Sequence, residues 1–500
     1  MKENRHMSTD AALPSSDILP DGYHCAVTWS VPFDFGGMTE ALLHRSRAFV
    51  TGAGQSVDVL TFAYENDYDD IRCELAAEGK TVPGIRLRNL WEELAEMSDE
   101  TMMKVVPADR LRGKFRPIDE HDEYDEDRFG GILRRRFRRN SATQAALQTD
   151  YFRPDGTIYA SDRKDLDERG IEGGRIVSLC DSEGTPVMSW NQIWPLYLFW
   201  LDVVTGSRET YMIVDSKSSA NFITRYRRPN VISMHLVHNS HLASGTKRPF
   251  GELSPSRKYV FERLDTFDAV VFLTKQQKED VDALVGEQSN TCVIPNSRNI
   301  PPMSYAKHDR QRDSSVILAS LTKRKRINHA IAAVSEAMQS TGLKVTLDIY
   351  GHGSEAGTLA ALITESGLND SIRLLGYSSA AKEKFKEASF TLLTSTLEGQ
   401  GLVLVEAMSM GCIPISYDIP YGPADFITDG VNGFLVRPGD IKGLAERIVQ
   451  IVGMNESELQ DMRANARQTA EAFTDRASTE RWGQEMRAAV DRKLAEATSR

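Results

Sequence analysis

The sequence predicts an α/β protein with two doubly wound parallel sheets and an antiparallel β-rich insertion in the first of them. Three observations support this prediction. Short apolar strands alternate with helices near the start of the chain, the same alternation returns after residue 315, and charged, alternating segments interrupt it over residues 66–208. Strands that helices cover on both faces are short and almost continuously apolar, whereas half-exposed antiparallel strands alternate.

Length and composition indicate a globular protein of several domains. The chain has 500 residues, of which 41% are hydrophobic and 26% charged, which corresponds to roughly two to four domains. A net charge of −11 disfavours bulk binding of nucleic acid, so we expect no nucleic-acid partner. Five cysteines without C-x-x-C spacing are typical of reduced thiols. The longest apolar run, residues 193–201, contains Pro195 and is too short for a membrane span.

The polar first residues lack a hydrophobic signal segment, so residues 1–22 are predicted to be a disordered leader of a cytoplasmic protein. The first domain, predicted over residues 23–305, opens with a β-branched strand at 25–29. The loop Gly36-Gly37 and apolar residues at helical spacing over 38–49 follow. With a second strand at 57–62, this order is typical of a doubly wound domain.

The predicted insertion covers residues 66–208. It contains an acidic block at 119–127 and a basic block at 134–139. Further on, Pro154-Asp155-Gly156 separates two alternating runs, and Asp-Gly between such runs predicts a β-hairpin. We expect the two charged blocks to form a solvated surface that pairs with itself, rather than a binding site.

The pattern of short, almost continuously apolar strands returns after the insertion and continues through a second domain. In the first domain it predicts strands at 210–215, 231–237, 268–274 and 291–296. Rising polarity over 307–314 suggests an interdomain linker. The second domain, predicted over 306–475, has strands at 315–319, 345–350, 372–375, 390–394 and 413–416. The chain is helical after Asp440, with a C-terminal helix at 476–500. Ligands of such sheets bind at the carboxyl ends of the strands.

The segment with the most chemical information is Glu398-Gly-Gln-Gly-Leu-Val-Leu-Val-Glu406. Glu398 follows a predicted strand, Gly401 opens a helix, and Glu406 lies one to two turns into it. The glycines allow close approach of a ligand, and the first N–H groups of the helix can bind an anion. Two carboxylates around such a site could hold a diphosphate with a polyol on each side. The alternative is a helix-capping glutamate followed by a surface glutamate.

This spacing of two glutamates at a strand–glycine–helix junction, followed by Gly411-Cys-Ile-Pro-Ile415, resembles the retaining GT-B glycosyltransferases of family 4. Four further segments are similar to motifs of that family in the same order: Val293-Ile-Pro-Asn296, Ile349-Tyr-Gly-His-Gly-Ser-Glu355, Leu374-Leu-Gly-Tyr377 and Asn432-Gly-Phe-Leu-Val436. The resemblance covers residues 210–475 and 23–62, and it implies two Rossmann-like domains that face a cleft.

Within the family, residues 417–425 resemble the version found in poly(glycerol-phosphate) and poly(ribitol-phosphate) α-glycosyltransferases of wall teichoic acid. Those enzymes carry a β-rich insertion in the first domain, at about the position of residues 66–208, which supports oligomerisation. Enzymes that place N-acetylglucosamine on serine-rich adhesins share the layout. The resemblance implies a homo-oligomer, a trimer among the options, and a peripheral position near a membrane is compatible with it.

The resemblance also implies roles for residues of the second domain. Glu398 would contact the donor hexose and Glu406 the ribose hydroxyls. Gly401 and Leu402 would offer backbone N–H groups to the diphosphate. Tyr377 lies in the segment that resembles the nucleobase loop.

In the first domain, Gly36 and Gly37 match the family's glycine loop against the distal phosphate, although an ordinary β–α turn would need the same residues. His238 resembles the histidine that reaches the donor sugar or the acceptor side. His235, His238 and His241 together suggest a metal site, but His235 and His238 would point to opposite faces of a strand. This arrangement disfavours zinc, and the resemblance implies no catalytic metal and no bound cofactor.

The leaving diphosphate needs positive charge. The family places an arginine and, five residues later, a lysine after the first strand of the second domain. Lys325 matches the lysine, while Ser320 stands where the arginine is expected. Lys323, Arg324 or Arg326 could substitute, or this stretch could be an ordinary basic loop.

Three further arginines, Arg225, Arg227 and Arg228, could meet a polyanionic acceptor or lie on a solvated surface.

Together with the resemblance, the sequence predicts a retaining transferase that moves glucose or N-acetylglucosamine from UDP-glucose or UDP-N-acetylglucosamine to a polyol-phosphate polymer or glycan. The alternatives are a protein O-glycosyltransferase for Ser/Thr-rich substrates and a catalytically silent GT-B scaffold, which Ser320 would favour.

Overall fold

The computed structural model describes residues 17–105, 115–243, 245–246, 248–300 and 310–498. The chain divides into two compact units. One unit contains residues 40–54 and the chain from His235 onward, and the other contains residues 21–39 and 55–234. The predicted leader, residues 1–22, lies mostly outside the described residues.

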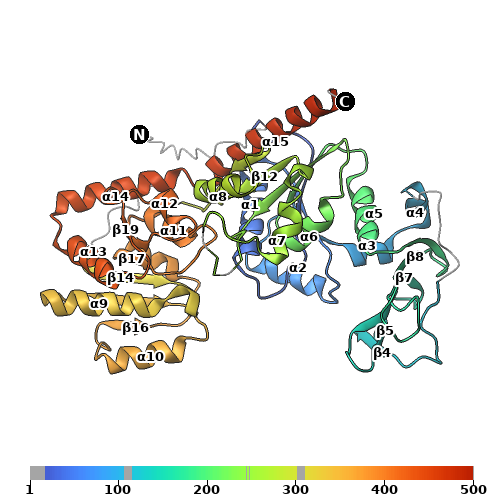
Figure 1. The fold of residues 1–500 in the computed structure, drawn as a ribbon, viewed down its shortest axis with the longest axis horizontal. Helices are drawn as coiled ribbons and strands as arrows, with labels where there is room; N and C mark the ends of the chain where they lie inside the picture. The colour runs from blue at the N-terminus through green and yellow to red at the C-terminus, as the bar shows by residue number, and fades with distance from the viewer. Residues whose placement is uncertain (1–16, 106–114, 244, 247, 301–309, 499–500) are drawn as a thin grey trace, which may run out of the picture. The chain divides into compact units, whose positions relative to one another are not determined.

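The first half of the chain builds a seven-stranded sheet with the order β13-β12-β11-β10-β1-β2-β3 (Figure 1). The β1–β2, β1–β10, β2–β3 and β12–β13 pairs are parallel. The strands are β1 (Tyr23–Val27), β2 (Val57–Thr61), β3 (Ile85–Asn89), β10 (Thr210–Val214), β11 (Val231–Val237), β12 (Ala269–Phe272) and β13 (Thr291–Val293). Every residue of β1, β2, β10, β11 and β12 is buried, as expected for strands that are covered on both faces.

Helices connect these strands, in agreement with the predicted doubly wound pattern. They are α1 (Gly37–Ala53), α2 (Tyr68–Ala77), α3 (Leu90–Glu96), α4 (Asp99–Val105), α5 (Trp194–Thr205), α6 (Lys217–Ile223), α7 (Pro255–Phe261) and α8 (Lys275–Val285), with a 3-10 turn η2 (Leu264–Thr266).

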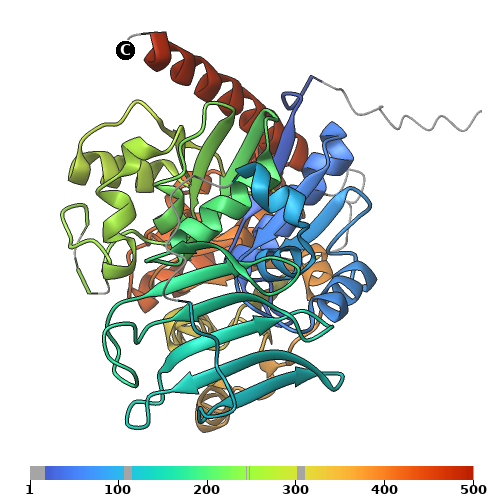
Figure 2. The ribbon, with the colours of Figure 1, turned by 90° about the vertical axis from the view of Figure 1, so that its right-hand side faces the viewer.

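A six-stranded antiparallel sheet with the order β4-β5-β6-β7-β8-β9 interrupts this alternation (Figure 2). Its strands are β4 (Asp125–Phe129), β5 (Ile132–Arg139), β6 (Ala146–Phe152), β7 (Ile158–Arg163), β8 (Ile176–Cys180) and β9 (Pro186–Trp190). The predicted hairpin turn at Asp155-Gly156 joins β6 to β7. Residues 66–208 also include α2, β3, α3 and α4 before the sheet and α5 after it.

The charged blocks of the insertion pair with each other, as predicted. In the register of β4 and β5, Asp127 lies opposite Arg135 and Glu126 opposite Arg136. The Arg135 Nη2 and Asp127 Oδ2 atoms are 2.6 Å apart, and the Arg136 Nε and Glu126 Oε1 atoms are 3.0 Å apart. The alternating composition is thus a ladder of cross-strand ion pairs.

The second half of the chain forms a parallel six-stranded sheet with the order β16-β15-β14-β17-β18-β19. Its strands are β14 (Gln311–Leu318), β15 (Thr346–Tyr350), β16 (Ile372–Leu374), β17 (Ala388–Leu393), β18 (Ile413–Tyr417) and β19 (Phe434–Val436). Its helices are α9 (Ile327–Thr341), α10 (Ala356–Glu365), α11 (Leu402–Ser409), α12 (Pro423–Phe426), α13 (Ile441–Gly453), α14 (Glu456–Glu471) and α15 (Asp475–Thr498), with 3-10 turns η4 (Lys323–Lys325) and η5 (Ala381–Lys386).

The predicted linker over 307–314 was partly wrong, because β14 begins at Gln311. Gln311 lies opposite Ala388 of β17, and the register shifts before Ser315. The side chains of residues 311–314 stay at least partly exposed. Their polarity therefore suggested a linker, although the backbone of this segment pairs within the sheet. Residues 301–309 lie outside the described residues. Among the described helices, none is both long and apolar enough to cross a membrane.

Candidate active site

The segment between β17 and α11 brings two carboxylates to one helix N-terminus. Gly401, the N-cap of α11, has φ 82° and ψ 42°, a left-handed conformation that glycine adopts without strain. Helix α11 begins at Leu402, so its first N–H groups have no acceptor within the helix. Glu398 precedes this N-terminus, and Glu406 lies one turn inside the helix. The backbone therefore has the geometry that the sequence predicted here.

Glu398 is held from several directions. Its Oε1 atom accepts hydrogen bonds from Lys325 Nζ and Ser395 Oγ, each at 2.6 Å. Its backbone N–H donates to Pro420 at 2.9 Å, and its carbonyl accepts from Tyr421 at 3.0 Å. The residue is 8% exposed. Glu398 is thus a nearly buried carboxylate that forms an ion pair with Lys325, and both residues belong to the predicted site.

The loop that carries Lys325 is fastened to the end of β17. The Thr394 hydroxyl donates to the carbonyls of Lys325 and Arg326, each at 2.9 Å. The Thr396 N–H donates to the Arg324 carbonyl, also at 2.9 Å. These bonds explain why Lys325 and Glu398, which are 73 residues apart, meet in one place.

His238 follows β11, as predicted, and its main chain packs against the Glu398 loop. A Cβ atom on Gly399 would lie 2.2 Å from the His238 carbonyl oxygen, so only glycine fits at position 399. The structure therefore brings the His238 backbone, Lys325 and Glu398 together.

The other two histidines of that stretch lie in aromatic surroundings. His235 stacks on Phe267 at a ring distance of 5.4 Å. His241 stacks on Phe261 at 5.7 Å and on Tyr421 at 6.2 Å, and burial lowers its pKa to about 4. Across the described residues, no group of three or more His, Cys, Asp or Glu side chains could hold a metal ion.

A pocket of about 450 Å³ lies beside the start of α11. Four residues that the sequence assigned to this region line it: Ser320, Tyr377, Leu402 and Glu406. Tyr377 is 73% exposed, and its ring contacts that of His352 edge-on at 5.7 Å. Tyr377, Glu406 and Leu402, predicted for the nucleobase, the ribose and the diphosphate, thus border one cavity, whereas Gly401, Lys325 and Glu398 are not among the residues that line it.

The two glycines of the predicted G-x-G motif allow a close backbone approach after β15, and Gly351 lines this pocket. A Cβ atom on Gly351, which has φ 148°, would lie 1.8 Å from the Ala319 carbonyl oxygen. On Gly353 it would lie 2.3 Å from the Leu321 carbonyl oxygen. The motif therefore lets the backbone after β15 approach the loop that carries Ser320.

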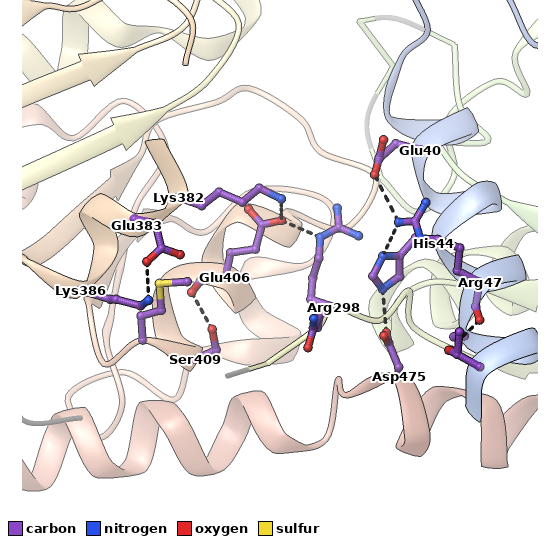
Figure 3. Close-up of a pocket in the computed structure, with 14 residues that line it drawn as sticks. Glu40, His44, Arg47, Arg298, Lys382, Glu383, Lys386, Glu406, Ser409 and Asp475 are labelled. Carbon is purple, nitrogen blue, oxygen red and sulfur yellow. Dashed lines mark hydrogen bonds and ion pairs between the residues drawn. The ribbon is translucent and has the colours of Figure 1, made fainter. Parts of the chain in front are cut away.

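Glu406 has two cations on one oxygen atom. Arg298 Nε lies 2.6 Å and Lys382 Nζ 2.8 Å from Glu406 Oε1. These three residues also line a second cavity of about 730 Å³, which Figure 3 shows. Across it, Asp475 Oδ1 of α15 lies 2.7 Å from His44 Nε2 of α1.

Sequence reasoning missed Arg298 and Lys382, which lie 108 and 24 residues from Glu406 along the chain. Neither belongs to a motif that the sequence offered. The candidate substitutes for an arginine at position 320, namely Lys323, Arg324 and Arg326, are not among the residues that line the 450 Å³ pocket.

The remaining predicted residues belong to the other compact unit. Gly36 and Gly37 lie at the start of α1, and no atom would crowd a Cβ on either of them. Arg228 forms a paired contact with Asp202 at 2.7 and 2.8 Å, and Arg225 stacks on Trp194 at 4.5 Å. The phosphate role of the glycines and the acceptor role of the arginines stay predictions.

Comparisons with known proteins show which proteins the chain is similar to. The family "Glycosyl transferases group 1" matches residues 306–469. The poly(glycerol-phosphate) α-glucosyltransferase of Bacillus subtilis is 24% identical over 94% of this chain and 76% of its own length. The poly(ribitol-phosphate) α-N-acetylglucosaminyltransferase of Staphylococcus aureus is 23% identical over 89% of this chain and 96% of its own. The GtfA subunit of a Streptococcus pneumoniae UDP-N-acetylglucosamine–peptide N-acetylglucosaminyltransferase is 30% identical over 45% of this chain and 46% of its own.

Solved structures share the fold over nearly the whole chain. A crystal structure of TarM has a TM-score of 0.71 at 20% identity and covers 94% of this chain and 99% of its own. The pneumococcal O-GlcNAc transferase GtfA in complex with UDP and GlcNAc has a TM-score of 0.64 at 20% identity, with coverage of 94% and 99%. The chain therefore has the GT-B fold, as its sequence predicted, and its residues 306–469 form a glycosyl transferases group 1 domain.

Proposed function

We propose that this protein is a retaining glycosyltransferase of family 4 that transfers glucose or N-acetylglucosamine from a UDP-sugar to a polyol-phosphate polymer. One observation carries the proposal: Glu398, paired with Lys325, and Glu406 flank the N-terminus of α11, and Glu406 lines a pocket together with Tyr377 and Ser320. The names of the Bacillus and Staphylococcus relatives, which act on poly(glycerol-phosphate) and poly(ribitol-phosphate), support the acceptor class.

The donor would lie along this helix N-terminus. Glu406 accepts the ribose hydroxyls, Tyr377 covers the base, and the N–H groups at Gly401 and Leu402 contact the diphosphate. Glu398 faces the hexose. Both bonds that fix the Glu398 carboxylate go to Oε1, so Oε2 is the oxygen that we assign to the sugar hydroxyls.

Lys325 is the cation that we assign to the leaving group. Its Nζ atom lies 2.6 Å from Glu398 Oε1. Incoming diphosphate competes for the same ammonium, and positive charge in a dry site stabilises the departing phosphate by several kcal/mol. The acceptor hydroxyl attacks on the face that the diphosphate leaves, and an oxygen of the leaving group takes its proton. The new bond keeps the α configuration, and electrostatic stabilisation supplies most of the rate.

Product analysis tests the proposal against its alternatives. Radiolabelled UDP-glucose and UDP-N-acetylglucosamine are offered with poly(glycerol-phosphate), poly(ribitol-phosphate) and a serine-rich peptide. Label on a polymer, with an α linkage by NMR, supports the proposal. Label on the peptide alone supports the protein O-glycosyltransferase, an alternative that the similarity to the GtfA subunit favours. UDP binding without transfer to any of the three supports the silent scaffold, which Ser320 favours.

We further propose that the enzyme works in the cytoplasm, needs no bound cofactor and assembles through residues 66–208 as a homo-oligomer. Five free cysteines fit a reducing compartment. Light scattering of the full chain tests the assembly, and the mass of a single 55.8 kDa chain would contradict it.

A further inference from the structure

We propose that Arg298 is a positioning residue that holds the Glu406 carboxylate for the ribose and thereby makes the pocket select ribonucleotides over 2′-deoxyribonucleotides. This inference rests on the proposed function, because it takes the ligand of Glu406 to be the ribose of a nucleoside diphosphate.

The contacts of Arg298 make it a fixed support. Its Nε atom donates to Glu406 Oε1 at 2.6 Å, and its Nη1 atom donates to the Ser297 carbonyl at 3.0 Å. The side chains of Arg298 and Glu406 are 15% and 11% exposed. A guanidinium that is bonded at two places and nearly buried has little freedom to follow a moving carboxylate, so it sets where that carboxylate lies.

Lys382 contacts the same oxygen but is placed differently. Its side chain is 55% exposed, and a lysine ammonium is a flexible point charge. Lys382 therefore adds positive charge near Glu406 but does little to fix the position of its carboxylate. The two cations should consequently differ in effect, with Arg298 the more important for the ribose.

The free side of Glu406 is the part that a ligand can use. Both cations lie on Oε1, which leaves the acceptor capacity of Oε2 for hydroxyl groups. The 450 Å³ pocket and the 730 Å³ cavity share Arg298, Lys382 and Glu406. In Figure 3, Arg298 extends between Glu406 and the pair of His44 and Asp475, so it supports the carboxylate from the side of the larger cavity.

The charge around Glu406 also supports a role for Arg298 in nucleotide binding. An isolated Glu406 would repel a nucleotide diphosphate, whereas one carboxylate with two cations carries a net positive charge. Ser320 lines the same pocket and adds no charge. Arg298 and Lys382 thus allow a carboxylate to serve the ribose next to an anionic ligand.

Calorimetric titration of the full chain with UDP and 2′-deoxy-UDP tests the inference. Wild-type protein should bind UDP more tightly. Arg298→Ala should weaken UDP binding roughly tenfold, the scale of one charge-assisted hydrogen bond, and 2′-deoxy-UDP binding by a clearly smaller factor, because both nucleotides lose the attraction of one positive charge but only UDP loses the ribose contact. Arg298→Lys, which keeps the charge, should restore only part of the preference. Because the ratio of the two dissociation constants does not depend on the fraction of folded protein, partial unfolding cannot imitate the result.

Two further variants separate the possible causes. Lys386→Ala is the matched control, since Lys386 lies on the same 3-10 turn as Lys382 but pairs with Glu383; it should leave both affinities unchanged. In a Glu406→Gln background, Arg298→Ala should cause no additional loss of UDP affinity.

Equal losses for UDP and 2′-deoxy-UDP in Arg298→Ala would overturn the inference, because they would mean a direct contact with phosphate. A response no larger than that of Lys386→Ala would overturn it as well. Failure of the proposed function has a different signature: wild-type protein would bind neither nucleotide, or Glu406→Gln would leave the preference for ribose unchanged.

Discussion

Buried and nearly buried carboxylates in the candidate active site and in the insertion are satisfied in different ways. In the active site, the bonds to Glu398 go to one oxygen, and so do those to Glu406. In the insertion, Asp165 is bonded on both oxygens, to Arg163 at one and to Arg138 and the Gly170 N–H at the other. A carboxylate with an unused oxygen can take a ligand, whereas a saturated one can only hold the fold together.

Asp150 of the insertion follows the same rule as Asp165. Ser161 and Gln148 donate to its Oδ1 atom, and the Ile118 N–H donates to Oδ2 at 2.6 Å. Burial raises the pKa of Asp150. For Asp165, burial acts in the same direction but is outweighed by its three donors, so its pKa is lowered. The two glutamates of the candidate site thus differ from Asp150 and Asp165 in the number of bonded oxygens, whereas Asp127 of β4, whose bonds all go to Oδ2, resembles the glutamates.

The largest expected effect is on Glu398, where we predict a loss of activity. Glu398→Gln should lower kcat about 10³-fold, near the upper range for one electrostatic contact in an active site. The UDP dissociation constant should stay within a few-fold, because the ribose is assigned to Glu406. Steady-state kinetics and calorimetry check this prediction, and a wild-type kcat would remove Glu398 from the mechanism.

A saturated carboxylate should show the opposite behaviour. Arg138→Met removes one cation from Asp165, whose side chain is 0% exposed, and should cost about 3 kcal/mol of unfolding free energy. Transfer per folded molecule should not change. Denaturant unfolding measures the loss.

The matched control in the insertion is Arg139→Met, which breaks an exposed pair with Asp125 at 3.2 Å. It should cost about 0.5 kcal/mol or less. If the Arg138 and Arg139 variants lost equal stability, the distinction between saturated buried pairs and the surface ladder would be wrong.

A third prediction concerns a buried ring whose nitrogen atoms have no hydrogen-bond partner among the described residues. In the described part of the chain, neither nitrogen of the His241 ring has a hydrogen-bond partner, and burial lowers its pKa from 6.5 to about 4. Between those values the unfolded chain binds a proton that the folded chain does not, so stability falls as the pH falls from about 6.5 to about 4.

His241→Phe removes this titration and keeps an aromatic ring beside Phe261 and Tyr421. The stability of the variant relative to wild type should rise by about 2 kcal/mol between pH 7 and pH 5. Urea unfolding at the two pH values measures it. A difference that does not change with pH would show that His241 gains a partner or protonates without cost.

The smallest expected effect is at Ser320, which lines the pocket of Glu406 without adding charge. Ser320→Arg should tighten UDP binding by about 1 kcal/mol, and less so at high salt. Titrations at two ionic strengths measure this change, with Arg324→Ala as the control, since Arg324 does not line the pocket. If Ser320→Arg left the UDP affinity unchanged and Arg324→Ala lowered it steeply, Arg324 rather than Lys325 would be the residue that contacts the phosphate.

The sequence by itself determined the features that depend on neighbouring residues. The distance from Glu398 to Glu406 follows from one strand end, one glycine and one helical turn, and backbone geometry sets it wherever the segment lies. The hairpin at Asp155-Gly156 and the short buried strands are local in the same sense. The pattern of apolar residues did not predict the first residues of β14, because backbone pairing can extend a strand through partly exposed polar residues.

Only the tertiary structure decided which partners those local features meet. Arg298 reaches Glu406 across 108 residues of sequence, and the place where the chain returns depends on the packing of whole sheets and helices. The contact of Gly399 with the His238 carbonyl arises in the same way. Which oxygen of a carboxylate stays open is a property of these returning segments, so no spacing along the chain could have revealed it.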